Sequence, residues 1–171
     1  MAREPLSGEP LTADPSPLIE WAEARMRLAD ARFYWLSTVR PDGGPHVRPV
    51  LAVSVDGALH STTNPNTRKG RNLARDSRCV ISAMTEGLDL VVEGRAEWVT
   101  DDSKLTRVAD VYASKYEWLV TARDGAFYAK YGAPTAGPPP YEVYEIVPAV
   151  VFGFGTDEAF AARSARWRFN V

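Results

Sequence analysis

A cluster of hydroxyl and basic side chains carries the strongest chemical signal in the sequence. Thr62 and Thr63 end an extended run, and Thr67, Arg68 and Lys69 open a helical pattern after a turn. The first amides of a helix have no intrahelical acceptors, and hydroxyls, a guanidinium and an ammonium beside them add charge-assisted donors. Such donors are typical of a site that holds a phosphate group, so the sequence predicts an anion site here.

Arg48 lies on the neighbouring extended run and is placed to close this site. The competing interpretation is that Arg68, Arg71 and Arg75 form only the solvated basic face of a helix. The adjacent hydroxyls and the position at a strand end favour the anion site.

Other kinds of chemistry receive no support from the sequence. The chain contains no GxSxG or Walker pattern, no GxGxxG after a strand and no HExxH. Its two histidines, His46 and His60, and its single cysteine, Cys79, are too few for a recognisable metal site. We therefore expect no metal and no catalytic side chain, and we interpret Cys79 as a buried apolar residue.

Composition narrows the class of protein. The 171 residues, 45% of them apolar, suffice for one globular domain, and 20 basic against 22 acidic residues leave a formal net charge of −2. This balance disfavours nucleic acid and anionic membranes as partners. No apolar run approaches the ~20 residues of a membrane helix, and residues 1–17 lack the pattern of a secretory signal. The sequence therefore predicts a cytoplasmic protein without a membrane partner.

The first residues are expected to differ from the rest of the chain. Prolines interrupt residues 1–17, which carry few aliphatic side chains, so we expect a flexible tail before one domain over residues 18–171. Ser16 and Pro17 predict the start of a helix. Its apolar face is expected to carry Ile19, Ala22, Met26, Ala29 and Phe33.

The remaining chain alternates between extended runs, turns and two helical segments. The helices are predicted at residues 68–76, with Leu73 facing inwards, and at residues 102–116. Residues 117–140 have no period and are interpreted as a functional or mobile loop. The expected strands are residues 33–39, 45–55, 58–63, 79–84, 88–99, 141–147 and 150–154, the last two separated by Pro148. Six or seven strands with few helices predict a mainly β fold, a small antiparallel barrel.

The region of the predicted anion site resembles a known family. The hairpin, the Thr62-Thr63 strand end and the helix start from Thr67 to Leu73 resemble the pyridoxamine 5′-phosphate oxidase-like FMN-binding split barrels. The resemblance is specific over about residues 33–100 and looser beyond them. There, VADVYASKY and the RWRF ending resemble an actinobacterial branch of flavin- or deazaflavin (F420)-dependent oxidoreductases.

This resemblance implies a six- to seven-stranded antiparallel split β-barrel with a few helices. It also implies a cofactor, F420 or FMN, whose phosphate is held by the hydroxyl and basic side chains and whose ring lies beside a strand backbone. The implied cofactor-binding residues are Arg48, Pro49, Val50, Leu51, Thr62, Thr63, Thr67, Arg68 and Lys69. In the family the site lies between two subunits, so a homodimer is expected.

Two departures from the family pattern bear on the reaction. Val53 stands where classical members have a lysine that grips the substrate phosphate, and RWRF replaces their C-terminal substrate motif. Vitamin B6 oxidation is therefore not expected. The resemblance implies instead an oxidoreductase that transfers a hydride between F420 or FMN and a small conjugated organic or tetrapyrrole-like substrate.

Aromatic residues near the end of the chain admit two interpretations. Trp167 and Arg168 are candidates to contact the cofactor or substrate as a stacking surface and an anion donor. Alternatively, Trp167 and Phe169 only anchor the last residues on the barrel. Three further tryptophans are interpreted as core or interface residues rather than ligand contacts: Trp35, Trp98 and Trp118.

Two other functions compete with the oxidoreductase. A non-catalytic flavin or haem/tetrapyrrole carrier would bind its ligand without room for a second molecule. A nucleic-acid module would use the basic residues from Arg68 to Arg78, but the net charge and the lack of a row of stacking aromatics disfavour it.

Overall fold

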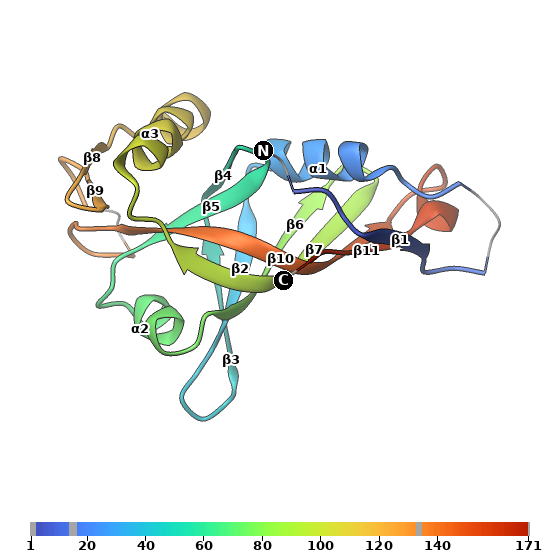
Figure 1. Cartoon of the computed structure of the whole chain (residues 1–171), viewed down its shortest axis with the longest axis horizontal. Coiled ribbons are helices and arrows are strands. Elements are labelled where there is room, and N and C mark those ends of the chain that lie inside the picture. The colour runs from blue at the N-terminus through green and yellow to red at the C-terminus, as the bar shows by residue number, and fades with distance from the viewer. Residues whose placement is uncertain (1–2, 14–16, 133–134, 171) are drawn as a thin grey trace.

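The structure, a computed structural model, describes residues 3–13, 17–132 and 135–170. These residues form a mainly β fold in which antiparallel strands make one large sheet and three α-helices pack on it (Figure 1). The helices are α1 (Trp21–Asp30), α2 (Arg68–Arg75) and α3 (Asp102–Tyr116), and a short 3₁₀ helix covers Ala161–Arg163. The strands of the large sheet are β1 (Ser7–Pro10), β2 (Tyr34–Val39), β3 (Pro45–Val50), β4 (Ala52–Val55), β5 (Ala58–Thr63), β6 (Arg78–Thr85), β7 (Leu88–Trp98), β10 (Glu142–Gly155) and β11 (Ala165–Arg168). A separate hairpin consists of β8 (Thr121–Arg123) and β9 (Ala126–Tyr128).

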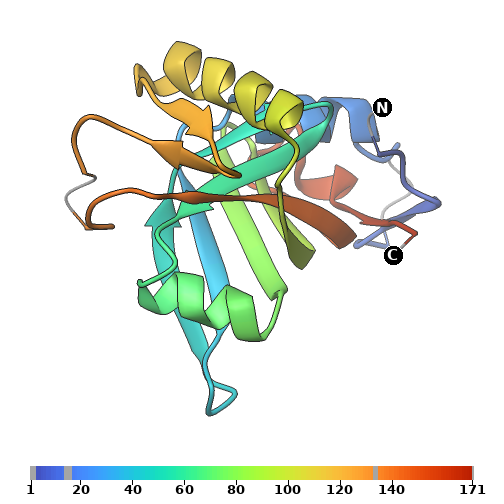
Figure 2. The same cartoon turned by 60° about the vertical axis from the view of Figure 1, so that its left-hand side comes forward.

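The sheet curls into a split barrel because the long strand β10 pairs with three neighbours. Strand order along the sheet is β1-β11-β10-β7-β6-β2-β3, while β5 also pairs with β10 and carries β4 (Figure 2). Ile146 on β10, for example, is registered with both Leu59 of β5 and Ala96 of β7. The predicted antiparallel split β-barrel is thereby confirmed, with nine strands in the described sheet where six or seven were expected.

A break at Leu51 divides the extended run that we predicted over residues 45–55. Its first part, β3, pairs with β2, and its second part, β4, pairs with β5. Because each half follows a different partner, the chain changes direction at Leu51. This break opens one wall of the site described below.

Two apolar cores support the barrel. One lies between α1 and the sheet and includes Leu28, Ile81 and Leu90, and the other lies under α3 and includes Leu105 and Val108. Cys79 is buried in the first core, as predicted. No helix in the described ranges has both the length and the apolar character needed to cross a bilayer.

Helix α1 differs from the prediction in both start and face. It begins at Trp21, and Ser16 lies outside the described residues. Ala24 and Leu28 are its buried residues, whereas Met26 is 58% exposed and Phe33, beyond the helix, is 67% exposed. Ala24 is small and Leu28 lies one turn later on the same side, so this side of the helix packs closely on the sheet. The predicted face with Met26 is turned towards solvent instead.

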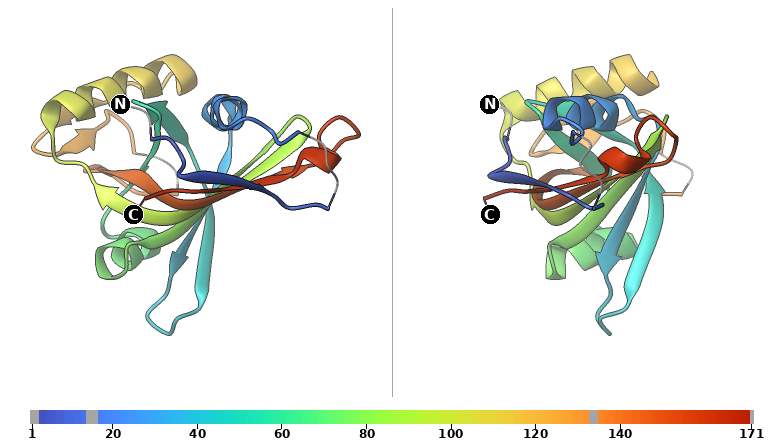
Figure 3. Two further views of the ribbon diagram at one scale, coloured as in Figure 1. Left: turned by 45° about the vertical axis from the view of Figure 1, so that its right-hand side comes forward. Right: turned by 90° about the vertical axis from the view of Figure 1, so that its right-hand side faces the viewer.

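The prediction of a flexible tail over residues 1–17 is wrong for residues 7–10. These residues form β1, which pairs antiparallel with β11 at the edge of the sheet (Figure 3). Glu9 forms ion pairs with Arg166 and Arg168, and Gly8 lies opposite Trp167. The stabilisation comes from backbone pairing and charge rather than from apolar side chains, which is why composition did not reveal it.

The predicted interruption at Pro148 is also wrong. Strand β10 continues through it, with a register shift between Pro148 and Val150 where β10 faces β7. The irregular register accommodates a residue without an amide hydrogen. Gly94 lies opposite, where an added Cβ would meet the Val147 carbonyl oxygen at 2.0 Å, so only glycine allows the two strands to approach there.

Candidate functional site

The start of α2 is held by hydroxyl groups from both sides of a tight turn. The Thr67 hydroxyl accepts a hydrogen bond from the Gly70 amide at 3.1 Å and donates to the Asn64 carbonyl at 2.8 Å. The Thr63 hydroxyl lies 3.0 Å from that of Thr67 and is buried. Thr63 and Thr67, both predicted to bind a cofactor, therefore position the helix start with their hydroxyls, and Thr67 caps α2 as expected.

Lys69 points from the first turn of α2 towards the end of β5. Its Nζ donates to the Thr62 carbonyl oxygen at 2.9 Å, and no carboxylate forms an ion pair with it among the described residues. Burial lowers the pKa of Lys69 to about 8. A half-buried ammonium without a counter-ion is a candidate binding site for an anion.

Lys69 lies at a groove of about 500 Å³, which is within the size range of cofactor and ligand sites. One wall comes from the β3–β4 break and from β5 and α2, and the other from the end of α3 and the segment after it. The lining residues are Pro49, Val50, Leu51, Thr62, Lys69, Tyr116, Trp118, Tyr131, Gly132, Thr135 and Ala136. Five residues that the sequence placed at a cofactor are thus brought together.

The aromatic wall of this groove was missed by the sequence analysis. Tyr116, Trp118 and Tyr131 come from the end of α3 and the segment interpreted only as a loop, and Trp118 was assigned to a core or interface. Trp118 is fixed by edge contacts with Tyr112 and Tyr141, at ring centroid distances of 5.3 and 5.6 Å. A density of aromatic residues in an aperiodic segment was the available signal.

Arg48 and Arg68 line a second cleft, of about 470 Å³, together with Arg40, Pro41, Asp42 and His46. The cleft and the groove have no lining residue in common, but Arg48, Arg68 and Lys69 all act electrostatically on His46, so their charges lie near one another. Neither Arg48 nor Arg68 forms an ion pair within the described ranges. Burial lowers the pKa of His46, and the neighbouring arginines lower it further. The cleft therefore offers uncompensated positive charge beside the groove.

The two predicted contacts at the end of the chain are not at this groove. Trp167 is 3% exposed and packs on Trp21 with ring centroids 5.5 Å apart, while Arg168 pairs with Glu9. Phe169 packs edge-on against Trp21 at 5.0 Å. Within one chain, Trp167 and Phe169 thus anchor the last residues on the barrel, and Trp167 and Arg168 do not line the groove.

Val53, which replaces the family's lysine, is fully buried in the core under α3. A lysine at this position would face that core rather than the groove. The second departure from the family pattern, the RWRF ending, lies on β11 against β1 and β10.

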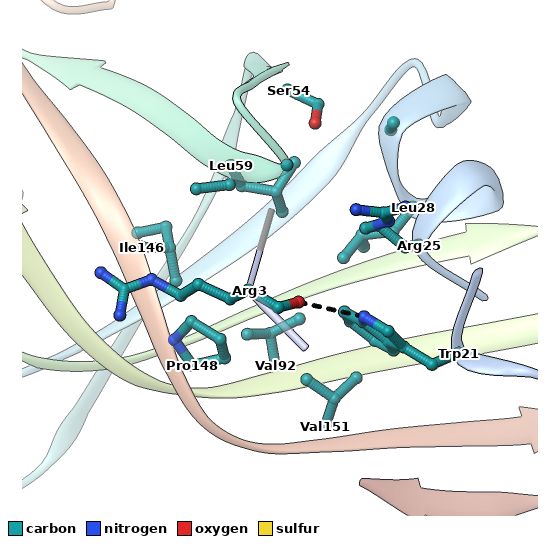
Figure 4. Close-up of a pocket in the computed structure, with 13 residues that line it drawn as sticks. Arg3, Trp21, Arg25, Leu28, Ser54, Leu59, Val92, Ile146, Pro148 and Val151 are labelled. Carbon is teal, nitrogen blue, oxygen red and sulfur yellow. Dashed lines mark hydrogen bonds between the residues drawn. The ribbon is translucent and has the colours of Figure 1, made fainter. Parts of the chain in front are cut away.

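A further cavity lies between Arg3, helix α1 and the barrel strands, where Leu59 and Val151 line it (Figure 4). Its volume of about 30 Å³ is the space of a single water, too small for a cofactor. The Trp21 Nε1 donates to the Arg3 carbonyl oxygen at 3.2 Å and closes one side (Figure 4). In the part of the chain that the structure describes, no group of three or more His, Cys, Asp or Glu side chains is arranged to hold a metal ion.

Comparison with known proteins identifies relatives of this fold. Residues 21–154 match the sequence profile of the family described as pyridoxamine 5′-phosphate oxidase. A conserved hypothetical protein of Mycobacterium tuberculosis is similar in structure, with a TM-score of 0.64 and 23% identity over 84% of this chain and 88% of that one.

Two other solved structures carry functional descriptions. A haem-binding protein of Mycobacterium smegmatis has a TM-score of 0.58 and 20% identity over 77% of this chain and 52% of that one. A protein described as an F420 reductase has a TM-score of 0.53 and 20% identity over 74% of this chain and 94% of that one. At identities this low, the structural similarity shows that the fold is shared. No curated protein matches the chain.

Proposed function

The chain belongs to the pyridoxamine 5′-phosphate oxidase family, and we propose that it is an oxidoreductase that binds F420 or FMN in the groove beside Lys69. The observation that carries this proposal is the Lys69 ammonium, which has no carboxylate partner among the described residues, at a groove with aromatic walls. Arg48 and Arg68 line the second cleft, and besides burial both arginines and Lys69 lower the pKa of His46, so the three cationic groups lie near one another. The donors suit an anionic phosphate group, and the walls suit a planar ring.

The residues present fit such a cofactor. Lys69, Arg48 and Arg68 would hold its phosphate, and the Pro49–Leu51 strip would lie beside its ring. When bound, the cofactor supplies a hydride acceptor or donor, which explains why the site needs no nucleophilic side chain.

The chain's own contribution is binding, orientation and exclusion of water. The Thr62 carbonyl keeps the Lys69 ammonium at the groove, at 2.9 Å from its Nζ. Tyr116 and Trp118 shield one side of the groove from solvent. The substrate is proposed to be a small conjugated organic molecule, because a planar group stacks well in an aromatic groove.

Pyridoxamine phosphate itself is not the proposed substrate. The lysine that grips its phosphate in the family is replaced by the buried Val53. Because the fold is shared with a protein described as an F420 reductase, F420 stands beside FMN as a candidate cofactor.

We also propose that the protein acts as a homodimer. The strand registers place Pro49, Trp35, Ser82, Val91 and Phe152 in one row across β3, β2, β6, β7 and β10, so these side chains share one face of the sheet. Exposed apolar residues flank the row: Val47, Met84 and Phe154. An uncovered apolar face of this extent is typical of a subunit interface. Pro49 also lines the groove, so a partner on this face would lie beside the site.

The first test is a pair of fluorescence titrations of the full-length apoprotein with FMN and with F420. The tighter cofactor is then titrated into Lys69→Ala and Arg68→Ala, with Arg95→Ala as a matched control because Arg95 is exposed on β7, away from the groove. Each lost charge-assisted contact should weaken binding by about 1.5–3 kcal/mol, while the control binds like the wild type. Failure of the wild type to bind either cofactor contradicts the proposal.

The same preparation distinguishes a non-catalytic carrier from an oxidoreductase. Stoichiometric binding of a flavin or of haem with no turnover across a panel of electron acceptors favours a carrier. Turnover with a conjugated acceptor and either cofactor favours the oxidoreductase.

A further inference from the structure

Three side chains on one face of α3 reach the break between β3 and β4. Tyr112, Lys115 and Tyr116 are spaced three and four residues apart, so they project from the same side of the helix. The break at Leu51 is also the part of the strand that lines the groove. The helix and the groove wall are therefore in direct contact.

Hydrogen bonds from these side chains converge on two successive carbonyl groups. The Tyr112 hydroxyl donates to the Leu51 carbonyl oxygen at 3.0 Å, and the Ser61 hydroxyl donates to the same oxygen at 3.1 Å. The next carbonyl, that of Ala52, accepts from the Tyr116 hydroxyl at 2.9 Å and from Lys115 Nζ at 3.3 Å. Each of these two oxygens thus lies within hydrogen-bond distance of two side-chain donors. The Tyr112 hydroxyl also lies 3.2 Å from the His60 carbonyl oxygen, and the Tyr116 hydroxyl 3.0 Å from that of Arg32, so each phenol shares its one proton between two acceptors.

Lys115 also connects the break to the rest of the barrel. Its Nζ donates to the Ala29 carbonyl at 2.7 Å and lies 3.1 Å from the Tyr34 hydroxyl, and it sits over the rings of Tyr34 and Tyr116 at 5.1 and 5.3 Å. Three N–H groups have three acceptors, so the ammonium is fully coordinated by the chain. It is not available to a ligand, in contrast to Lys69.

These hydrogen bonds matter for the groove, because the backbone at a break between two strands lacks ladder hydrogen bonds and moves more easily than the strands. Leu51 lies outside both strands and is 38% exposed. Without the side-chain donors, its peptide groups would depend on water, and the wall formed by residues 49–51 would have several conformations. Binding a planar ring against such a wall would first require ordering it.

We propose that Tyr112, Lys115 and Tyr116 are positioning residues that hold the β3–β4 break as a preformed wall of the groove. The inference rests on the proposed function, since it assigns this wall to the bound cofactor. Tyr116 contributes in two ways. Its ring lines the groove, and the hydrogen bond from its hydroxyl to the Ala52 carbonyl oxygen holds both the ring and that peptide group in place.

The test uses the full-length variants Tyr116→Phe and Lys115→Met, with Tyr128→Phe as the matched control. Tyr128 is on β9 and does not line the groove. Thermal unfolding first establishes that each variant is folded. Hydrogen exchange of peptides covering residues 47–55 is then measured on the apoproteins, and the affinity and limiting fluorescence anisotropy of the bound cofactor are measured on the complexes.

In both variants we expect faster exchange in residues 47–55 and in residues 29–34, which the same side chains bond, and wild-type exchange in the rest of the barrel. Cofactor affinity should fall about 5-fold per lost hydrogen bond, and the bound cofactor should have a lower limiting anisotropy because its wall has loosened. The Tyr128→Phe control should match the wild type in all three measurements.

Two results overturn the inference. In the first, the variants keep wild-type exchange, affinity and anisotropy; in the second, exchange increases throughout the barrel, which would mean that the bonds only hold α3 in place. If the wild type binds neither cofactor, the proposed function is contradicted. The exchange rates of residues 47–55 in the variants then test alone whether these side chains hold the groove wall.

Discussion

Lys69 offers a test in which stability and ligand affinity change in opposite directions with pH. Burial lowers its pKa from 10.5 to about 8, and the pKa of Lys115 is also lowered to about 8. Between pH 8 and 9 the folded apoprotein loses these protons while the unfolded chain keeps them, so the free energy of unfolding should rise with pH. The affinity for an anionic cofactor should fall over the same range, because Lys69 loses its charge.

Urea denaturation and cofactor titration at pH 7.5, 8.5 and 9 measure the two trends. In Lys69→Met the rise in stability should be smaller but not absent, since Lys115 still titrates. An affinity for the cofactor that stays constant in the wild type up to pH 9 would contradict a role for the Lys69 charge.

Glu145 is a second residue whose charge matters to the fold. It is 9% exposed, and its carboxylate lies 3.6 Å from His60 Nε2 and 3.2 Å from the Arg3 guanidinium, and also pairs with Lys104. His60 first, and then Lys104 and Arg3, hold the pKa of Glu145 well below its usual range, although burial opposes them. A carboxyl group with a lowered folded-state pKa stabilises the fold above its ordinary pKa and loses this effect as the pH falls.

Glu145→Gln should therefore lower the free energy of unfolding by about 1–2 kcal/mol at pH 7, because it removes the charged partner of Lys104 and Arg3, which are partly exposed and screened by solvent. The difference from the wild type should shrink between pH 5 and pH 2.5. Glu86→Gln, at an exposed position of the turn between β6 and β7, is the matched control and should change stability by less than about 0.5 kcal/mol. Equal urea midpoints for Glu145→Gln and the wild type at pH 7 would show that the cluster contributes nothing.

At the scale of residues, the sequence predicted which residue types lie at the site better than it predicted where their side chains point. Lys69 and Thr62 line the groove as predicted, because a strand end and a helix start are local features. The Thr63 and Thr67 hydroxyls form intrachain hydrogen bonds instead, which depends on how tightly the turn folds. The aromatic wall was not predicted, because the position of Trp118 depends on its packing between Tyr112 at the end of α3 and Tyr141, which is distant in the chain.

Among the elements, α2 depends on a close approach that only glycine permits. A Cβ on Gly70 would lie 2.5 Å from the Asn64 carbonyl oxygen and 2.8 Å from Pro65 Cα, both backbone atoms that cannot turn away. Alanine gains about 1 kcal/mol in helix propensity, but the clash should cost more than it returns.

We therefore expect Gly70→Ala to lower the free energy of unfolding by at least about 1 kcal/mol, and to weaken cofactor binding because α2 carries Arg68 and Lys69. Chemical denaturation and titration of the same preparation test both effects. Greater stability in Gly70→Ala than in the wild type would show that the turn yields easily and that propensity decides.

Helices α2 and α3 and most strands were predicted correctly, whereas β1 and the start of α1 were not, and the β8–β9 hairpin was missed within residues 117–140. Helices α2 and α3 start after Thr67 and Asp101, whose side chains cap the amides of Gly70 and Lys104. Strand β1 and the start of α1 depend on β11 and on the first core, which lie more than a hundred residues away in the chain or across the sheet. Local propensity contains no information about such pairing.

For the whole molecule, the decisive question is what covers the apolar face of the sheet. Trp35 is 49% exposed and is the second residue of the row that runs from Pro49 to Phe152. A second copy of the chain with the same face would bury this row, and because Pro49 belongs to both the row and the groove, dimerisation would also limit access to the site.

Trp35→Lys should accordingly convert the protein to a monomer, because a charge within an apolar interface is costly to desolvate. Light scattering coupled to size exclusion measures the mass directly. Trp98→Lys is the matched control: Trp98 is 54% exposed on β7, seven residues beyond Val91 of the row, and its substitution should leave the dimer intact. Cofactor titration of the Trp35→Lys monomer adds the functional consequence, since a site that needs its partner should lose affinity together with the dimer. A wild type that is monomeric at micromolar concentrations, or a Trp35→Lys variant that remains dimeric, would show that another surface or another partner covers this face.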